Sequence, residues 1–191
     1  MKAEDIWTKS ICDILNAQDF GQGIFIDVLQ KIPYALEVLH FEEDWRIDTA
    51  SCKSMPFQTD LVIYEKLNNQ IKPRVIIESK IDTVSTHDAI TYSNKASYHK
   101  NVIPYVRYGI MLGNRETYPL PGRLFRHGTN FDFLFSFVGK SPTEREQLYF
   151  IEMLRKEIEY SRKLEEIITN SRSKNRKHYF MLQKDFHLEE M

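Results

Sequence analysis

The chain has 191 residues, of which 42% are hydrophobic and 28% charged, with a formal net charge of −1 and two cysteines. This length suits one globular domain spanning residues 1–191, and a charge so close to zero excludes a purely electrostatic nucleic-acid coat protein. The apolar runs are too short to predict a membrane span, and the acidic N-terminus is unlike a secretory signal. Two cysteines are too few for a disulfide framework, so we expect a cytoplasmic protein.

The first half of the chain is predicted to begin with helices and to continue in strands. Trp7, Ile11 and Ile14 recur at helical spacing, which predicts a helix over residues 3–17. A second, short helix is expected over 24–31. Three strands rich in apolar residues are expected next, over 35–41, 58–66 and 73–81.

The second half is predicted to alternate between helix and strand. Ser85 is a suitable N-cap for a helix over 86–100, because Asp88 follows three residues later. Strands are expected on either side of a long loop, over 105–112 and 131–138, with the loop at 113–130.

The last helix has the clearest predicted start. Ser141 is the expected N-cap, Pro142 takes the first helical position and Glu144 completes a capping box, and the helix runs to about residue 169. Together these elements predict a mixed α/β fold with a central β-sheet flanked by helices. We expect the core at about 1–140, and a C-terminal helix and basic tail at about 141–191.

Two of these strands, 58–66 and 73–81, are predicted to pair as an antiparallel hairpin. A register centred on Asn69 pairs apolar residues across the two strands: Leu61 with Ile77, Val62 with Ile76, and Ile63 with Val75. The same register places Asp60 opposite Glu78.

Two facing carboxylates at the end of apolar strands repel each other, and desolvation adds to the cost. A divalent cation between Asp60 and Glu78 removes the repulsion, and hard oxygen ligands suit Mg²⁺. Because side chains alternate along a strand, Lys80 is expected on the same face as Glu78, with Ser79 pointing away. A lysine there can stabilise charge on a phosphate or position an attacking water molecule.

The order of an acid, a hairpin, a Glu-x-Lys triplet and a helix resembles the PD-(D/E)xK nuclease superfamily, which has the restriction-endonuclease-like fold. The resemblance covers about residues 1–140, and type II restriction endonucleases are the most similar members. It implies that Asp60, Glu78 and Lys80 are catalytic, that Asp60, Glu78 and the backbone carbonyl of Ser79 bind Mg²⁺, and that Lys80 assists the water. Thr59 stands where the family motif has proline.

Four further residues are candidate accessory groups. Asp88 and Tyr92 occupy the positions of a Gln-x-x-x-Tyr motif found in RecB-like members of the superfamily, although aspartate replaces the glutamine. Glu4 heads the apolar stripe of the first helix, and Glu37 lies in a predicted strand. The alternative for each is an ordinary solvated side chain.

Nucleic-acid contacts are expected from the helix after the hairpin, from the long loop and from the C-terminal basic run. The candidates are Lys95, Arg115, Arg123, Arg126, Arg172, Lys174, Arg176 and Lys177. The alternative for the C-terminal run is a solvated tail.

The sequence therefore predicts a Mg²⁺-dependent endonuclease that hydrolyses phosphodiester bonds in double-stranded DNA, of restriction-enzyme type. Cutting both strands most simply needs two sites, which favours a homodimer, formed through the helix at 142–169, and no membrane is involved. Two alternatives stay open. One is a repair, phage or mobile-element nuclease acting on ends or single strands, and the other is a non-catalytic DNA-binding module on the same fold.

Overall fold

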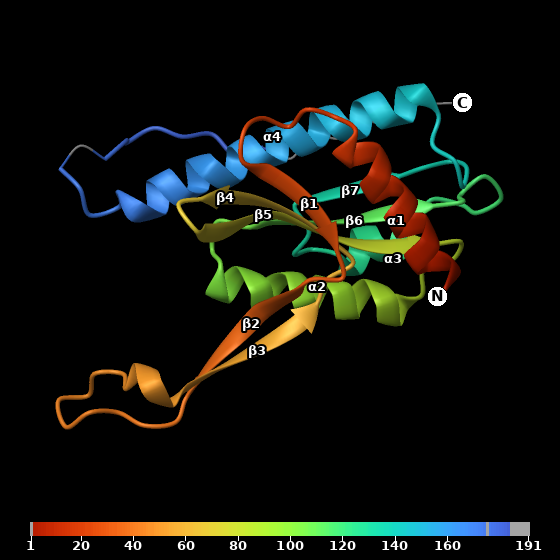
Figure 1. Cartoon of the computed structure of the whole chain (residues 1–191). Coiled ribbons are helices and arrows are strands. Elements are labelled where there is room, and N and C mark those ends of the chain that lie inside the picture. The colour runs from red at the N-terminus through yellow and green to blue at the C-terminus, as the bar shows by residue number, and fades with distance from the viewer. Residues whose placement is uncertain (1, 175, 184–191) are drawn as a thin grey trace.

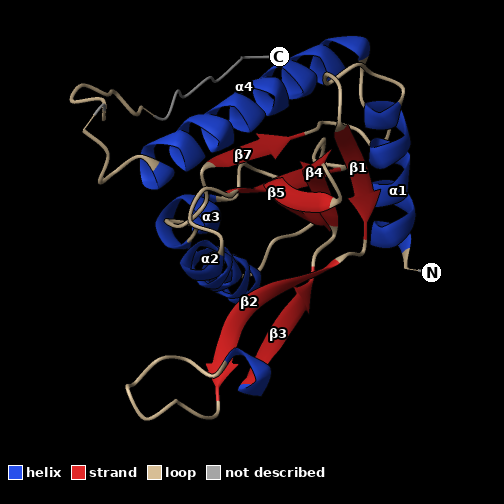
Figure 2. Ribbon diagram, turned by 60° about the vertical axis from the view of Figure 1, so that its left-hand side comes forward, coloured by secondary structure: helices blue, strands red, loops and turns tan. Residues whose placement is uncertain are grey.

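The computed structural model describes residues 2–174 and 176–183. Its centre is a five-stranded sheet in the order β1-β4-β5-β6-β7, with helices on both faces (Figures 1 and 2). The helices are α1 Ala3–Asn16, α2 Thr86–Val102, α3 Gly122–His127 and α4 Glu144–Thr169. The sheet strands are β1 Ile24–Val28, β4 Leu61–Leu67, β5 Gln70–Ile81, β6 Arg107–Gly113 and β7 Phe133–Ser136. The predicted mixed α/β fold with a central sheet flanked by helices is confirmed.

The sheet is mixed because β1, β4 and β5 pair antiparallel, whereas β5, β6 and β7 run parallel. The predicted pairing of Leu61 with Ile77, and of the two pairs that follow, is confirmed. The register shifts after Ile63, so the hairpin closes through a two-residue turn at Asn68 and Asn69, both at positive φ.

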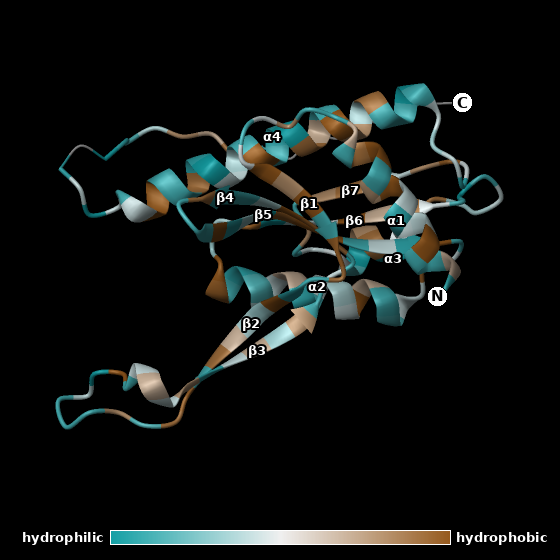
Figure 3. Cartoon of the chain, viewed as in Figure 1, coloured by the Kyte–Doolittle hydropathy of each residue, from teal (hydrophilic) through white to brown (hydrophobic). Residues whose placement is uncertain are grey.

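Each face of the sheet carries its own hydrophobic core. On one face, α1 and α4 pack against inward side chains such as Ile63 and Ile77. On the other, α2 and α3 pack against residues such as Ile76 and Tyr108. Hydrophobic and hydrophilic residues alternate along α4, which buries its apolar stripe against the sheet of its own chain (Figure 3). The dimer that we expected through this helix would therefore have to use its outer, largely charged side.

Two strands leave the body and form a separate antiparallel sheet, β2 Lys31–Val38 with β3 Cys52–Gln58. This pair and the loop that joins it, which contains a short 3₁₀ helix at Thr49–Ser51, are called the arm (residues 31–58). The arm projects away from the central sheet (Figures 1 and 2). The strand expected at 35–41 thus begins earlier, and the second strand of the arm was not predicted.

Three predicted elements need correction. The helix expected over 24–31 is wrong: this segment is β1 and the start of β2, because Ile24, Ile26 and Val28 alternate and Ile26 pairs with Ile63 as part of the core. The long loop at 113–130 contains α3. The strand expected over 131–138 is shorter, since β7 spans Phe133–Ser136, and Phe131 before it packs in the opposite core from Phe133.

The start of the last helix lies two residues later than predicted. Thr143, not Ser141, is the N-cap of α4, and it forms its capping box with Glu146 rather than Glu144. Glu146 also accepts a hydrogen bond from the backbone N–H of Val138, at 2.6 Å. This second hydrogen bond favours the later start of α4. Within the described residues, no helix combines the length and the apolar character that crossing a bilayer requires.

Candidate active site

The C-terminal end of β5 presents the predicted Glu-x-Lys triplet to two different helices. Glu78 and Lys80 contact residues of α2, whereas the hydroxyl of Ser79 lies 2.5 Å from that of Thr8 on α1. The expected alternation along this strand is therefore confirmed. Glu78 is fully buried, with 0% of its surface exposed, and Lys80 is half-buried near the C-terminal end of this central strand.

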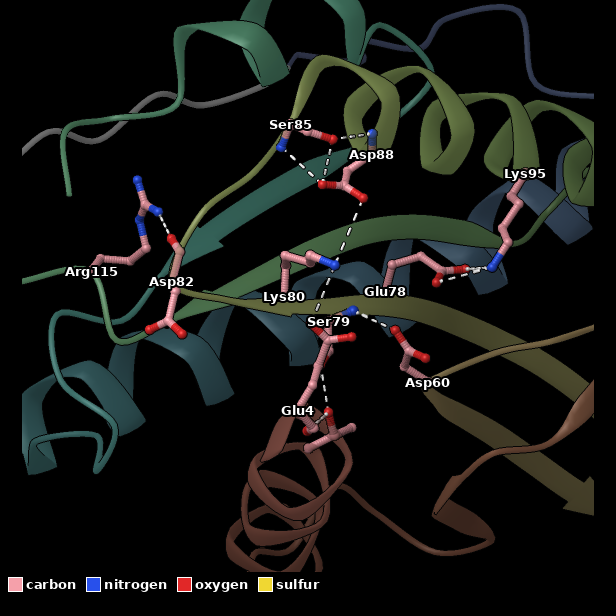
Figure 4. A network of polar contacts seen from close by, with 11 residues as sticks. Glu4, Asp60, Glu78, Ser79, Lys80, Asp82, Ser85, Asp88, Lys95 and Arg115 are labelled. Carbon is pink, nitrogen blue, oxygen red and sulfur yellow. Dashed lines mark hydrogen bonds and ion pairs between the residues drawn. The ribbon is translucent and has the colours of Figure 1, made fainter. Parts of the chain in front are cut away.

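Asp60 lies immediately before β4, next to the pairing of Leu61 with Ile77. Its Oδ2 atom accepts a hydrogen bond of 2.8 Å from the backbone N–H of Ser79. This bond brings the carboxylate of Asp60 to the end of β5, beside Glu78 (Figure 4). The hairpin therefore joins the two acids as the sequence predicted.

The two acids have raised pKa values because they share a buried environment. Burial, and then the charge of Asp60, raise the pKa of Glu78 to about 7. Burial likewise raises the pKa of Asp60. Two groups favour the charged form of Glu78: the ammonium of Lys95, whose Nζ is 3.4 Å from both carboxylate oxygens, and the hydroxyl of Tyr108, which donates at 2.5 Å.

Lys80 lies between acids of two helices. Its Nζ atom is 3.6 Å from Oε2 of Glu4 on α1 and 3.7 Å from Oδ1 of Asp88 on α2 (Figure 4). Asp88 is itself held by the predicted capping box, because it accepts hydrogen bonds from the backbone N–H and the hydroxyl of Ser85. The structure therefore brings two of the four candidate accessory residues, Glu4 and Asp88, to Lys80.

Tyr92 and Lys95 follow Asp88 along α2, one and two helical turns further on. Lys95 Nζ lies 5.2 Å from the centre of the Tyr92 ring and 5.7 Å from that of Phe57, at the base of the arm. Burial, and then the charge of Glu78, raise the pKa of Tyr92. Tyr92 thus lines the site, whereas Lys95, expected to contact phosphate, points at Glu78.

The remaining candidates lie elsewhere. Glu37 is exposed on β2 of the arm, where it pairs with Lys53. Arg115 is nearly buried, and its guanidinium donates to the backbone carbonyls of Asp82 and Pro119, so it braces its loop. The exposed residues are Arg123 and Arg126 on α3, and Arg172, Lys174, Arg176 and Lys177 after α4.

Sequence reasoning missed two polar partners, Tyr108 and Thr8. Tyr108 lies in β6 and reaches Glu78 only because β5 and β6 pair in parallel with Ile76 opposite Tyr108. Thr8 faces Ser79 only because α1 packs on that side of the sheet. A tyrosine inside an apolar run and a threonine on a buried helix face are the sole local signals for them.

The donor set fits a hard cation. Among residues 2–174 and 176–183, no three side chains of His, Cys, Asp or Glu form a group that could hold a metal ion. The side chains therefore offer two carboxylates, Asp60 and Glu78, and backbone oxygen, water and phosphate would complete the shell. Mg²⁺ characteristically binds through one or two carboxylates while keeping several waters. A cation there would also offset the repulsion by Asp60, which adds to the effect of burial in raising the pKa of Glu78.

No protein-family model and no curated protein matches the chain. Among solved structures it is similar to the restriction endonuclease BsaWI, in a crystal structure of a pre-specific complex with DNA. The two sequences are 12% identical, and the structures superpose with a TM-score of 0.49 over 83% of this chain and 62% of the BsaWI chain. This chain therefore spans less than two thirds of the length of the BsaWI chain. Such a likeness establishes no family, and function must be inferred from the side chains.

Proposed function

We propose that the protein is a Mg²⁺-dependent endonuclease that hydrolyses phosphodiester bonds in double-stranded DNA, of restriction-enzyme type. The observation that supports this most is the pair of carboxylates, fully buried Glu78 and partly buried Asp60, beside a half-buried lysine on the same strand face as Glu78. Replacing buried ionic groups by apolar residues of similar volume is often neutral or stabilising, so stability alone gives little reason for such a set of residues.

Each side chain has a separate task in this proposal. Asp60 and Glu78, with the backbone carbonyl of Ser79, hold the ion, which when bound supplies a Lewis acid for phosphate and water. Lys80 positions the attacking water or stabilises charge that develops on the phosphate. Glu4 and Asp88 hold its ammonium from both sides, at 3.6 and 3.7 Å.

Contacts to the DNA backbone are proposed for α3. Its exposed Arg123 and Arg126 lie on a helix that packs against α2, and Arg123 donates to the backbone carbonyl of Val84, just before α2 begins. The start of α2 also carries Asp88, which contacts Lys80. These two arginines therefore lie on the same side of the molecule as the proposed catalytic lysine.

Cleavage of supercoiled plasmid and of linear DNA tests the proposal. We expect nicked and linear products with Mg²⁺, none with EDTA, and a loss of about 100-fold or more in rate for Lys80→Ala and Glu78→Gln. Lys66→Ala, which changes an exposed lysine of the same hairpin, is the matched control and should cut normally. Discrete fragments would identify an endonuclease, and progressive loss from ends would replace it with the end-acting alternative.

Two results would overturn the proposal. One is cleavage that persists in EDTA or in the Lys80→Ala protein. The other is no cleavage of any DNA with Mg²⁺ by a protein that circular dichroism shows to be folded.

A further inference from the structure

The arm carries a tip whose side chains face solvent. Phe41 and Ile47 form an isolated bridge, and the chain turns between them with Glu42 N–H donating to the carbonyl of Arg46 at 2.8 Å. Trp45 lies in this turn with 83% of its surface exposed. The tip (residues 39–48) is thus an ordered turn at the far end of the arm, away from the body of the molecule (Figure 1), and the side chain of its Trp45 is exposed.

The backbone of Trp45 is also in an unusual conformation. Its φ angle is +65°, in the left-handed region that bulky residues rarely adopt. The ring of Phe41 lies 6.2 Å from that of Trp45, and the arm exposes further hydrophobic residues: Leu36, Leu39, Ile47 and Met55. A projecting arm that exposes several apolar side chains, with a strained tryptophan at its tip, is typical of a protein-binding site.

The charge of the tip selects the kind of partner. Residues 39–48 contain four acids, Glu42, Glu43, Asp44 and Asp48, and a single arginine, Arg46. Arg46 is already paired with Glu42 and Asp44. A negatively charged tip repels DNA phosphates. It is therefore suited to a partner that presents basic residues together with apolar side chains.

The chain itself contains such a surface after α4. Arg172, Lys174, Arg176 and Lys177 are exposed, and no acid lies among the described residues from 171 to 183. They are followed by four exposed hydrophobic residues, with Tyr179 at 85%: Tyr179, Phe180, Met181 and Leu182. This C-terminal segment (described residues 171–174 and 176–183) is positively charged, whereas the tip is negatively charged, and both expose aromatic side chains.

The two segments are apart within one molecule. The arm and the C-terminal segment leave the same side of the body, with α2 and the end of α4 between them, and the start of α1 lies on the opposite side (Figures 1 and 2). Glu4 of the active site is at that start. The C-terminal segment is therefore far from Lys80, which disfavours the DNA contacts that the sequence suggested for it.

We propose that the protein forms a homodimer in which the tip of each arm docks on the C-terminal segment of the second copy. Because one chain carries both halves of the contact, a two-fold axis makes both contacts at once and closes the assembly. Trp45 and its apolar neighbours form the centre of each contact, and the acids of the tip pair with the basic residues around it.

Charge reversal in the full chain tests this arrangement. Reversing the tip (Glu42→Lys, Glu43→Lys and Asp44→Lys) or the C-terminal segment (Arg172→Glu, Lys174→Glu and Arg176→Glu) should each weaken dimerisation at least about tenfold by analytical ultracentrifugation. An equimolar mixture of the two variants should form a heterodimer, since both of its contacts are again between opposite charges. The control reverses three exposed acids elsewhere, Glu116, Glu152 and Glu159, and should dimerise normally.

Tryptophan emission gives a second readout. Trp7 is buried, with 6% exposed, so a blue shift that grows with protein concentration reports Trp45 and should vanish in Trp45→Ala. The proposal is overturned if the wild-type protein is monomeric across the micromolar range, or if the mixture fails to associate. It is also overturned if reversing the C-terminal segment weakens DNA binding while the dimer persists.

Discussion

Lys95 lies where a bound cation would act on Glu78, because its Nζ atom is 3.4 Å from both carboxylate oxygens. The ammonium offsets the charge of a fully buried acid, and it also occupies space beside that acid. A divalent cation at Asp60 and Glu78 must therefore enter against the positive charge of Lys95. The residue is expected to stabilise the metal-free protein and to weaken its affinity for metal.

Replacing Lys95 by methionine separates these two effects. Without metal, we expect Lys95→Met to lower the free energy of unfolding by about 1–3 kcal/mol, because Glu78 loses its charged partner. Ca²⁺, used as a non-hydrolytic probe, should then raise the melting temperature of the variant more than that of the parent. Thermal unfolding with EDTA and with Ca²⁺ measures both effects.

The matched control is Lys66→Met, at an exposed position of β4 close to the hairpin turn, which should behave as the parent does. Equal Ca²⁺-induced shifts in the parent and Lys95→Met would show that Lys95 and the cation do not compete. This measurement does not depend on DNA cleavage, so it remains informative if the substrate is wrong.

Among the single residues of the site, the sequence predicted those that one hairpin brings together. Asp60, Glu78 and Lys80 follow from one hairpin register and the two-residue repeat of a strand. Lys95 was expected to contact phosphate, and the structure places its ammonium beside Glu78, because helical spacing does not say what a helix face contacts. Tyr108 reaches Glu78 through a parallel pairing that no short-range pattern encodes.

The elements show the same limit. The hairpin and α2 were predicted well because their turn and capping residues are adjacent in the chain. The segment 24–31 was mistaken for a helix because its alternation is short and it becomes a strand only by pairing with β4, far along the chain. For the last helix, two overlapping capping boxes compete, and the hydrogen bond from Val138 to Glu146 favours the second.

Close packing between β6 and β7 gives a prediction for the sheet. A Cβ atom added at Gly109 would overlap the ring of Phe133, which pairs with it across the two strands. Gly109→Ala should therefore lower the free energy of unfolding by about 1–3 kcal/mol, because the ring is buried and the core must overpack. Urea unfolding followed by circular dichroism measures the loss.

Gly122→Ala is the comparison for that experiment. It lies in α3, and an added Cβ would meet nothing closer than 3.7 Å, at the end of the flexible Arg126 side chain. Its stability should stay near that of the parent. If both variants lose the same amount, the overlap with Phe133 is not the cause.

For the whole molecule, the arm joins the body through buried aromatic contacts. The imidazole of His99 on α2 lies within hydrogen-bonding distance of two backbone carbonyls, at 3.0 Å from Lys95 and 3.2 Å from Ile32 at the start of the arm. The rings of Tyr34 and Phe57 stack beside it with 3.6 Å between their centres. The arm is therefore held to the same helix that contacts the active site.

This junction is expected to be sensitive to acid. Burial lowers the pKa of His99, and the nearby ammonium of Lys95 adds to that effect. A histidine whose pKa is lower in the folded state contributes stability above its unfolded pKa of about 6.5, and this stability is lost as the pH falls below that value. Between about pH 7.5 and 5.5 we therefore expect the contribution of His99 to the free energy of unfolding to decline, mostly below pH 6.5, whereas Glu78, whose pKa is raised to about 7, contributes in the opposite sense.

Urea unfolding at several pH values in this window provides the measurement. As the pH falls, the free energy of unfolding should decline less or rise more in His99→Gln than in the parent, whereas His40→Gln, which changes an exposed histidine of the arm, should keep the slope of the parent. A slope unchanged in His99→Gln would assign the pH dependence to other groups.

The position of α1 determines when the site can form during synthesis of the chain. Thr8 and Glu4 are synthesised first, but their partners Ser79 and Lys80 follow much later, since Ser79 is 71 positions after Thr8. Tyr108, which completes the surroundings of Glu78, is made later still. A chain growing on the ribosome therefore holds no assembled site until β6 has emerged and closed on β5, since long-range pairing forms slowly. If the protein has the nuclease activity proposed above, that activity should therefore appear only once the sheet is complete, and an unfinished chain should not cut DNA.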